Sequence, residues 1–152
     1  MPPLLRDYRP DDFETLWKID QVCFAQGISY TRRELAFYVG QERAFTLVGE
    51  LDGRIVGFVV VDRDHHRQGH VVTIDVLAEA RRSGLGSRLM AAAEERLRTL
   101  GCSTVFLEAA VDNAAALVFY KRHGYSVVQT IPRYYLDSID GLVLVKDLLP
   151  ET

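Results

Sequence analysis

The segment 80–90, ARRSGLGSRLM, has the residue types and spacing of a site that could bind a charged ligand. Gly84 and Gly86 stand between an apolar, strand-like stretch and a strongly amphipathic, helix-like one. Glycines at such a turn let the backbone approach a ligand closely, and the first helical turn presents unpaired N–H groups at the positive end of its dipole. Because Arg81 and Arg82 add positive charge, we predict an anion site suited to a pyrophosphate. The alternative is that the two glycines only make a tight turn.

Two other phosphate-binding motifs do not fit this segment. A dinucleotide-binding fingerprint needs a third glycine inside a βαβ unit, whereas a hairpin pattern precedes residues 80–90. A P-loop needs Gly-Lys followed by Ser or Thr, which is missing. The prediction is therefore a pyrophosphate loop of another type.

Glu108 is the second residue that could do chemistry. It lies in an otherwise apolar stretch, VFLEAAV at 105–111, where a carboxylate needs a functional reason or an ion pair. A solvent-facing position on the sheet is the alternative. His65, His66 and His70 follow one another closely, but a polar turn explains them better than a metal site does, and we expect no metal.

The hydrophobic pattern predicts a mixed α/β sheet with helices on both faces. Asp52-Gly53 is a strong hairpin signal, and the strand that follows it is apolar enough to be buried on both faces. The predicted order is β-α-α-β-β-β-α-β-α-β-β, antiparallel early and parallel around the third helix. The predicted strands are 4–8, 44–51, 54–61, 71–77, 103–111, 125–130 and 142–146, and the predicted helices are 10–22, 31–39, 84–100 and 112–124.

Length and composition set the remaining limits. The chain has 152 residues, of which 48% are hydrophobic, and this fits a single domain over 1–152 with one sizeable core. A formal net charge of −3 gives no bulk attraction to nucleic acid or to an anionic membrane. The longest apolar runs are too short to span a bilayer. Cys23 and Cys102 have no redox or metal spacing, so we expect free thiols in a cytoplasmic protein.

In these features the sequence resembles the GNAT superfamily of N-acetyltransferases. Arg81-x-x-Gly84-x-Gly86 is similar to the acetyl-CoA pyrophosphate loop of that family, and residues 107–125 look like its following strand-helix-strand segment. The closer resemblance is to RimI-type and archaeal Nα-acetyltransferases. It implies the GNAT fold, acetyl-CoA as donor without a metal, and acetylation of the α-amine of a protein or peptide N-terminus.

The resemblance also implies roles for single residues. Glu108 matches the glutamate read as general base in the RimI type, and Tyr120, twelve residues later, matches the general acid. His70 matches a histidine that archaeal enzymes use beside the glutamate. An exposed turn histidine and a tyrosine used only for packing are the alternatives, and which of Glu108 and His70 is the main base stays open. Asn113 matches a pantetheine contact but is also an obvious helix cap.

The binding residues are expected from the same resemblance. The fourth and fifth strands should part to admit the pantetheine arm, with an N–H near Val76 or Leu77 facing the thioester oxygen. The expected acetyl-CoA contacts are Ile74, Val76, Leu77, Arg81, Arg82, Ser83, Gly84, Leu85, Gly86, Ser87, Asn113 and Tyr120. The expected acceptor contacts are Gln26, Gly27, Ile28, Tyr30, Tyr134 and Tyr135.

Two other functions stay open at this stage. The acceptor could be a small amine, such as a polyamine, an amino acid or an antibiotic, and Asp137 and Asp140 could then supply acidity to a closed site. The chain could also be a non-catalytic acyl-CoA-binding module. No nucleic-acid or membrane partner is expected, and the chain should be a monomer or a weak homodimer.

Overall fold

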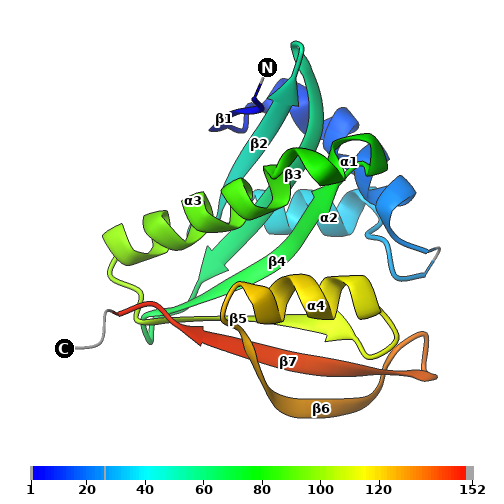
Figure 1. The fold of residues 1–152 in the computed structure, drawn as a ribbon, viewed down its shortest axis with the longest axis vertical. Helices are drawn as coiled ribbons and strands as arrows, with labels where there is room; N and C mark the ends of the chain where they lie inside the picture. Colours follow the sequence, from blue (N-terminus) through cyan, green and yellow to red (C-terminus); the bar gives the residue numbers. More distant parts are fainter. Residues whose placement is uncertain (1, 26, 150–152) are drawn as a thin grey trace.

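One mixed sheet organises the chain in the computed structural model, which describes residues 2–25 and 27–149 (Figure 1). Its seven strands within these ranges lie in the order β1-β2-β3-β4-β5-β7-β6. All neighbouring strands are antiparallel except β4 and β5, which are parallel. The strands are β1 (Leu4–Asp7), β2 (Phe45–Leu51), β3 (Arg54–Arg63), β4 (Gln68–Val76), β5 (Thr104–Ala110), β6 (Ser126–Tyr135) and β7 (Ile139–Asp147).

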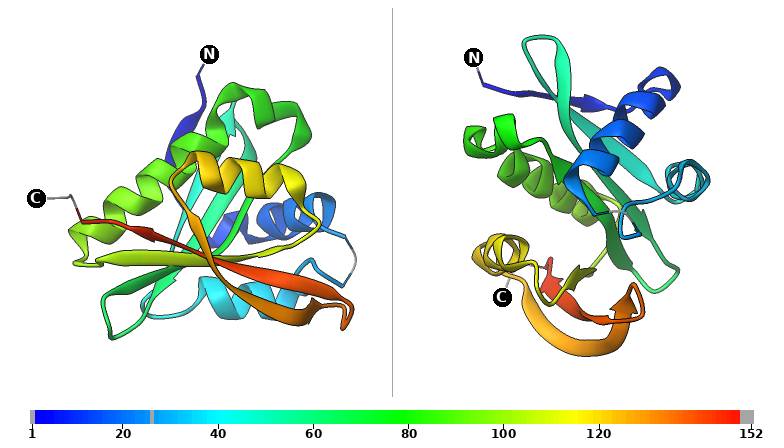
Figure 2. Two further views of the ribbon diagram at one scale, coloured as in Figure 1. Left: turned by 60° about the horizontal axis from the view of Figure 1, so that its bottom comes forward. Right: turned by 90° about the vertical axis from the view of Figure 1, so that its right-hand side faces the viewer.

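The helices cover both faces of this sheet, as the sequence predicts. In Figure 2, α1 and α2 lie on one face, and α3 and α4 lie on the other. The predicted capping box at the start of α2 is present, because the Thr31 hydroxyl and the Glu34 side chain each accept a backbone N–H of the other residue. The helices are α1 (Phe13–Cys23), α2 (Arg32–Val39), α3 (Leu85–Thr99) and α4 (Ala114–Arg122), with 3-10 turns at Pro10–Asp12 and Ala78–Ser83.

The predicted element order is confirmed, but several predicted bounds are wrong. β4 begins at Gln68, inside the stretch predicted as a turn. β6 and β7 both extend well beyond the predicted 125–130 and 142–146. β6 is an exposed strand at the edge of the sheet, so its sequence lacks the apolar alternation that marks a half-buried strand. Tyr134 and Tyr135 therefore end a strand instead of forming a loop.

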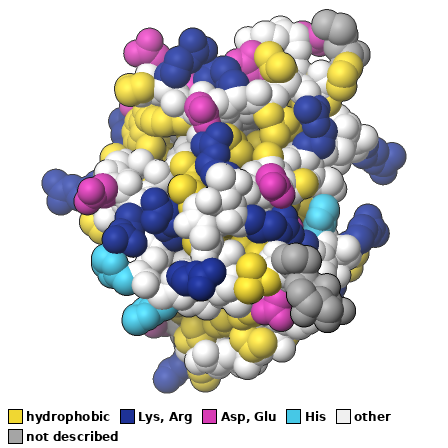
Figure 3. Space-filling view, turned by 90° about the vertical axis from the view of Figure 1, so that its left-hand side faces the viewer, with side chains coloured by type: hydrophobic (Ala, Val, Ile, Leu, Met, Phe, Trp, Pro, Cys, Tyr) yellow, Lys and Arg dark blue, Asp and Glu magenta, His cyan; other side chains and the backbone are white. Residues whose placement is uncertain are grey.

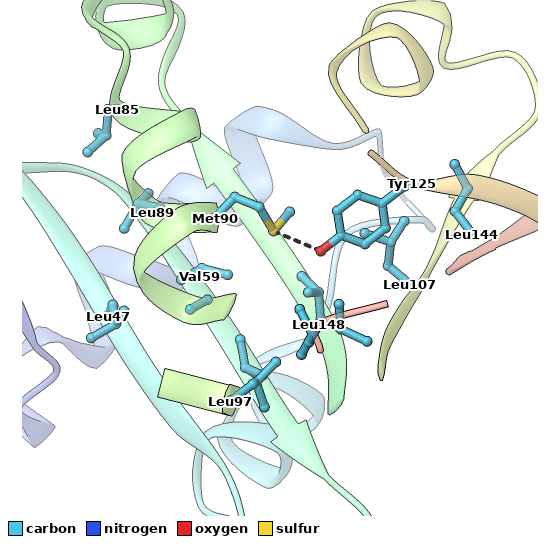
Figure 4. Packing of buried hydrophobic residues seen from close by; sticks show 14 of the residues in the cluster. Leu47, Val59, Leu85, Leu89, Met90, Leu97, Leu107, Tyr125, Leu144 and Leu148 are labelled. Carbon is cyan, nitrogen blue, oxygen red and sulfur yellow. Dashed lines mark hydrogen bonds between the residues drawn. The ribbon is translucent and has the colours of Figure 1, made fainter. Parts of the chain in front are cut away.

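The main core lies between α3 and the sheet (Figure 4). Buried apolar side chains of α3 pack there on side chains of β2 and β3, and the same cluster extends to β5 and β7. Burying one such side chain contributes about 1.5–3 kcal/mol. The labelled members are Leu47, Val59, Leu85, Leu89, Met90, Leu97, Leu107, Tyr125, Leu144 and Leu148.

A buried polar group joins α3 to the far half of the sheet. Glu94 of α3 is nearly inaccessible to solvent, and its carboxylate accepts hydrogen bonds from the Tyr125 hydroxyl at 2.9 Å and from the Lys146 ammonium of β7 at 2.8 Å. The Tyr125 hydroxyl also contacts the Met90 sulfur at 3.4 Å. A buried carboxylate with a cation and a donor is satisfied, so this cluster links the two halves of the sheet without an orphaned charge.

Removing the cation of this cluster should destabilise the protein. Lys146→Met leaves Glu94 buried without its charge partner, and we expect a loss of about 3 kcal/mol in the free energy of unfolding. Urea unfolding followed by circular dichroism at pH 7 measures this. The double variant Glu94→Gln/Lys146→Met buries no charge and should recover part of the loss. Equal stabilities of the single and double variants would contradict this role.

The surface gives no sign of a single dominant charged patch on the face that Figure 3 shows. Lys and Arg side chains are spread over that face among exposed hydrophobic and acidic ones. No helix in the described ranges combines the length and apolar character needed to cross a bilayer.

Candidate active site

The parting of β4 from β5 creates the candidate site. These two strands pair only over the first three residues of each, 68–70 with 104–106. Beyond that point they separate, and two adjoining cavities lie there. The larger, of about 430 Å³, is lined by residues 71–74 of β4 and 107–110 of β5. The smaller, of about 370 Å³, lies against residues 74–76.

The backbone of β4 presents hydrogen-bonding groups toward this opening. The Leu77 N–H donates to the Val56 carbonyl oxygen at 2.9 Å and is therefore occupied. Hydrogen bonding alternates along an antiparallel strand, so the N–H groups of Val76 and Ile74 point away from β3, toward the opening. Of the two N–H groups expected near a thioester oxygen, Val76 remains a candidate and Leu77 does not.

The predicted pyrophosphate loop forms the turn into α3. Gly84 adopts φ +81°, a left-handed conformation that favours glycine. A side chain on Gly86 would begin 3.3 Å from the Phe119 ring, so this position allows close packing of α3 on α4. Gly86 and Arg81 line the smaller cavity, and the Arg81 Nε donates to the Val76 carbonyl at 3.0 Å.

The other loop residues lie at the same turn with different exposures. Arg82, Ser83 and Ser87 are exposed. The Ser87 hydroxyl is 2.9 Å from the His123 Nε2. Leu85 is fully buried in the core, so only its backbone N–H can face a ligand. The backbone N–H groups of Leu85, Gly86 and Ser87 belong to the first turn of α3. They therefore lack intrahelical acceptors and suit an anion.

Glu108 and His70 meet at the base of the opening. Glu108 lines the larger cavity, and its two carboxylate oxygens lie 2.8 and 2.9 Å from the His70 Nε2. The His70 ring stacks on Phe106 with a centroid distance of 4.4 Å. On its other side, the His70 Nδ1 lies 3.4 Å from a carboxylate oxygen of Asp62. Glu108 is therefore in an ion pair as well as in the cavity wall, and His70 is not an exposed turn residue.

The charge of His70 is governed by these neighbours. Burial alone would lower its pKa, but the Asp62 and Glu108 carboxylates outweigh this and raise the pKa to about 9. His70 is therefore an imidazolium at neutral pH, with both N–H groups directed at carboxylates. A neutral imidazole, which a histidine base requires, is a minor form there.

Tyr120 and Asn113 lie where the two cavities meet, because each lines both of them. Burial and then the charge of Asp75 raise the pKa of Tyr120 above its usual value, which keeps its hydroxyl protonated. The Asn113 side chain accepts the Ala116 N–H at 3.2 Å, so it caps α4 while it lines the opening. Phe119, which precedes Tyr120 on α4, also lines the smaller cavity.

The expected acceptor residues are only partly brought together. Ile28, Tyr30 and Tyr135 line the larger cavity, and the Tyr30 hydroxyl donates to the Val72 carbonyl at 3.2 Å. Tyr134 is 48% exposed and packs edge-on against Tyr135 instead of lining that cavity. Gly27 has φ +89° and lies against the Leu136 side chain. Gln26 lies outside the described residues.

Several residues of the site carry no clear signal in the sequence. Phe24, Leu136 and Ile139 line the larger cavity, although their types are those of ordinary core or turn positions. Cys23 lines both cavities, and burial raises the pKa of its thiol to about 11, so it is unreactive at neutral pH. No group of three potential metal ligands occurs among the described residues.

Two buried carboxyl groups, Asp20 of α1 and Asp75 of β4, also lie at the cavity walls. Asp20 accepts the Tyr30 N–H at 2.7 Å, and Asp75 accepts the Thr73 hydroxyl at 2.5 Å. The second oxygen of each carboxyl has no hydrogen-bond partner among the described residues. Burial and the neighbouring Asp20 carboxyl raise the pKa of Asp75 well above its usual value. We therefore expect Asp75 to be protonated and to share its proton with Asp20, which would satisfy both oxygens.

Asp75→Asn should therefore stabilise the protein at alkaline pH. A carboxyl whose pKa is raised by folding stabilises the fold at low pH, and this contribution is lost as pH rises through the raised value. Asparagine keeps the acceptor for Thr73 and supplies a permanent donor toward Asp20. We expect equal melting temperatures near pH 4 and a variant about 3 °C higher, roughly 1 kcal/mol, at pH 8.5. A difference that does not change with pH would contradict the shared proton.

Comparisons with known proteins agree with this geometry. Residues 7–125 match the model of the acetyltransferase (GNAT) family. N-alpha-acetyltransferase 30 from Schizosaccharomyces pombe is 30% identical, over 74% of this chain and 77% of that protein. An N-alpha-acetyltransferase from Sulfurisphaera tokodaii is 28% identical, over 95% and 92% of the two chains. The crystal structure of Ard1 from Thermoplasma volcanium superposes with a TM-score of 0.90 at 27% identity, covering 99% of this chain and all of that one.

Proposed function

Since this chain belongs to the acetyltransferase (GNAT) family, we propose that it transfers an acetyl group from acetyl-CoA to the α-amine of a protein or peptide N-terminus. The observation that carries the proposal is the open edge of β4, with Glu108 in one cavity wall and Tyr120 where the two cavities meet. Relatives named N-alpha-acetyltransferase support this choice of acceptor. Cys23 and Cys102 are free thiols, which supports the cytoplasmic setting that we propose with this function.

The residues at the smaller cavity fit acetyl-CoA, which supplies the acetyl group as a thioester. The free N–H groups of Ile74 and Val76 suit an extended pantetheine arm that continues the sheet. The turn at Gly84 and the first N–H groups of α3 suit its pyrophosphate, beside the exposed guanidinium groups of Arg81 and Arg82. Asn113 would contact the arm from α4.

The larger cavity suits an ammonium group attached to an uncharged residue. Its charged lining residues within the described ranges are Asp20, Glu108 and Asp112, and neither Lys nor Arg contributes to it there. Phe24 and Ile28 give it an apolar wall. An acceptor that arrives as an α-ammonium is attracted by the negative charges, whereas an acidic first side chain finds no cation.

We assign the two proton transfers of the reaction to Glu108 and Tyr120, which line the cavities. The α-ammonium must lose one proton before its nitrogen attacks, and Glu108 is the carboxylate that faces it. An α-amine has a pKa of about 7.7–8.0, against about 10.4 for lysine, so a carboxylate base can deprotonate it near neutral pH. As the carbon–sulfur bond breaks, the Tyr120 hydroxyl supplies the proton that the sulfur needs, and the second proton, which the nitrogen loses as it becomes an amide, restores the hydroxyl.

A panel of acceptors tests the proposed substrate through release of CoA. We expect turnover of short peptides with a free N-terminus that begin with Ala, Ser or Met, and loss of turnover when that terminus is acetylated. A peptide beginning with Glu should react at least about tenfold more slowly, because the cavity lacks a cation. Polyamines and N-blocked lysine peptides serve as controls. Turnover confined to polyamines would keep the family and overturn the acceptor.

Removing the proton-transfer groups should lower kcat while acetyl-CoA binding persists. Glu108→Gln keeps the size of the side chain but removes the base, and we expect a fall in kcat of about 10²–10⁴-fold. Tyr120→Phe removes only the hydroxyl, with an expected fall of about tenfold or more. Steady-state kinetics and calorimetric titration with CoA measure both properties. Wild-type kcat in both variants would show that other groups move these protons.

A further inference from the structure

Asp62, which the proposed chemistry leaves unused, is positioned by the sheet itself. It lies directly opposite His70 in the β3–β4 register, and His70 lies beside Phe106 in the β4–β5 register. Side chains that lie opposite one another on neighbouring strands share a face of the sheet. Glu108 follows two residues after Phe106 on β5, so it lies on that same face. The adjacent strands β3, β4 and β5 thus hold Asp62, His70 and Glu108 next to one another, in that order.

Glu108, His70 and Asp62 are ordered relative to the larger cavity, which is the proposed acceptor cavity. Glu108 lines that cavity, His70 lies behind it, and Asp62 contacts the opposite ring nitrogen of His70. The stacked Phe106 ring, with an interplanar angle of 15°, restricts rotation of the imidazole. Neither carboxylate has a Lys or Arg within 4.0 Å in the described part of the chain. His70 is therefore the cation that both carboxylates share, and one negative charge remains for the incoming ammonium.

We propose that Asp62 is a positioning residue: it holds His70 as an imidazolium with Nε2–H directed at Glu108, and so fixes the Glu108 carboxylate toward the acceptor amine. This inference rests on the proposed function, because it assigns the base of that reaction. His70 then acts only through Glu108 and does not take the amine proton itself. An imidazolium carries a proton on both ring nitrogens and so has no lone pair for the amine proton.

The arrangement predicts a limit to activity at alkaline pH. When His70 loses its proton, near pH 9, only one of its nitrogens still carries an N–H, and one carboxylate loses its donor. The groups that bear on His70 are Asp62 from β3 and Glu108 from β5. Farther out, the charge of Glu108 also raises the pKa values of nearby phenols, and these come from the α1–α2 segment, from α4 and from β6. They are Tyr30, Tyr120, Tyr134 and Tyr135.

Asp62→Asn tests the proposal by two independent measurements. Without the Asp62 charge, we expect the titration midpoint of His70, followed by NMR of the imidazole, to fall by about one unit or more. The alkaline limb of kcat/KM should move down with it, and kcat at pH 8 should fall about threefold or more, while KM for acetyl-CoA stays unchanged. Asp62→Glu, which restores a carboxylate, should recover most of both effects. Asp147→Asn, an exposed residue of β7, is the matched control.

The outcomes separate this proposal from the function on which it rests. A midpoint and a pH profile that both match those of the wild type would overturn the role of Asp62. A shifted midpoint with an unchanged profile would also overturn it, because Asp62 would then affect His70 without affecting the reaction. If wild-type protein acetylates polyamines instead of peptides, the proposed acceptor fails, and the same two measurements made with a polyamine still decide whether Asp62 positions the base. Thermal melting of each variant checks that it is folded.

Discussion

The early end of pairing between β4 and β5 is the constraint on which the rest of the structure depends. Two strands that part after three residues leave backbone N–H and C=O groups unpaired on both edges, which a fold tolerates only when something else binds them. Each strand must then be held by its other neighbour. β4 is paired along its length with β3, and every residue of β5 is paired with β7. The Glu94–Lys146 pair ties β7 back to α3, so the opening is framed by rigid elements.

Several ionisable side chains lie around the same opening between β4 and β5. Five carboxyl or imidazole groups near it would be costly singly, yet they occur in arrangements that lower this cost. Asp62 and Glu108 share the His70 cation, while burial and the neighbouring Asp20 raise the pKa of Asp75 and favour its uncharged form. The first arrangement leaves one net negative charge beside the larger cavity, and the second leaves only one of its two carboxyl groups charged. The negative charge that remains lies where the proposed ammonium group would approach.

The fold and part of the site could be predicted because their signals are local. Gly84 marks a turn that few other residues permit, and the apolar periodicity of α3 identifies the helix behind it. The Asp62–His70 contact could not be predicted, because it depends on the register between two strands and on a bulge that shifts that register between Val60 and Val61. The end of β6 could not be predicted for a related reason, since an exposed edge strand has no buried face to impose a pattern.

The site also divides its tasks between backbone and side chains. The backbone of β4 and the first turn of α3 present the groups suited to the acyl donor, so their geometry depends on strand pairing and on glycine conformation. In the proposed mechanism, side chains from β3, β4 and β5 instead control the protons, and α4 brings Tyr120 to the place where the two cavities meet. Substitutions of residues that line only the larger cavity, such as Ile28, are therefore expected to change the preferred amine without disturbing the donor. The proton-transfer groups are less free to vary, because each depends on the position of its neighbour across a strand.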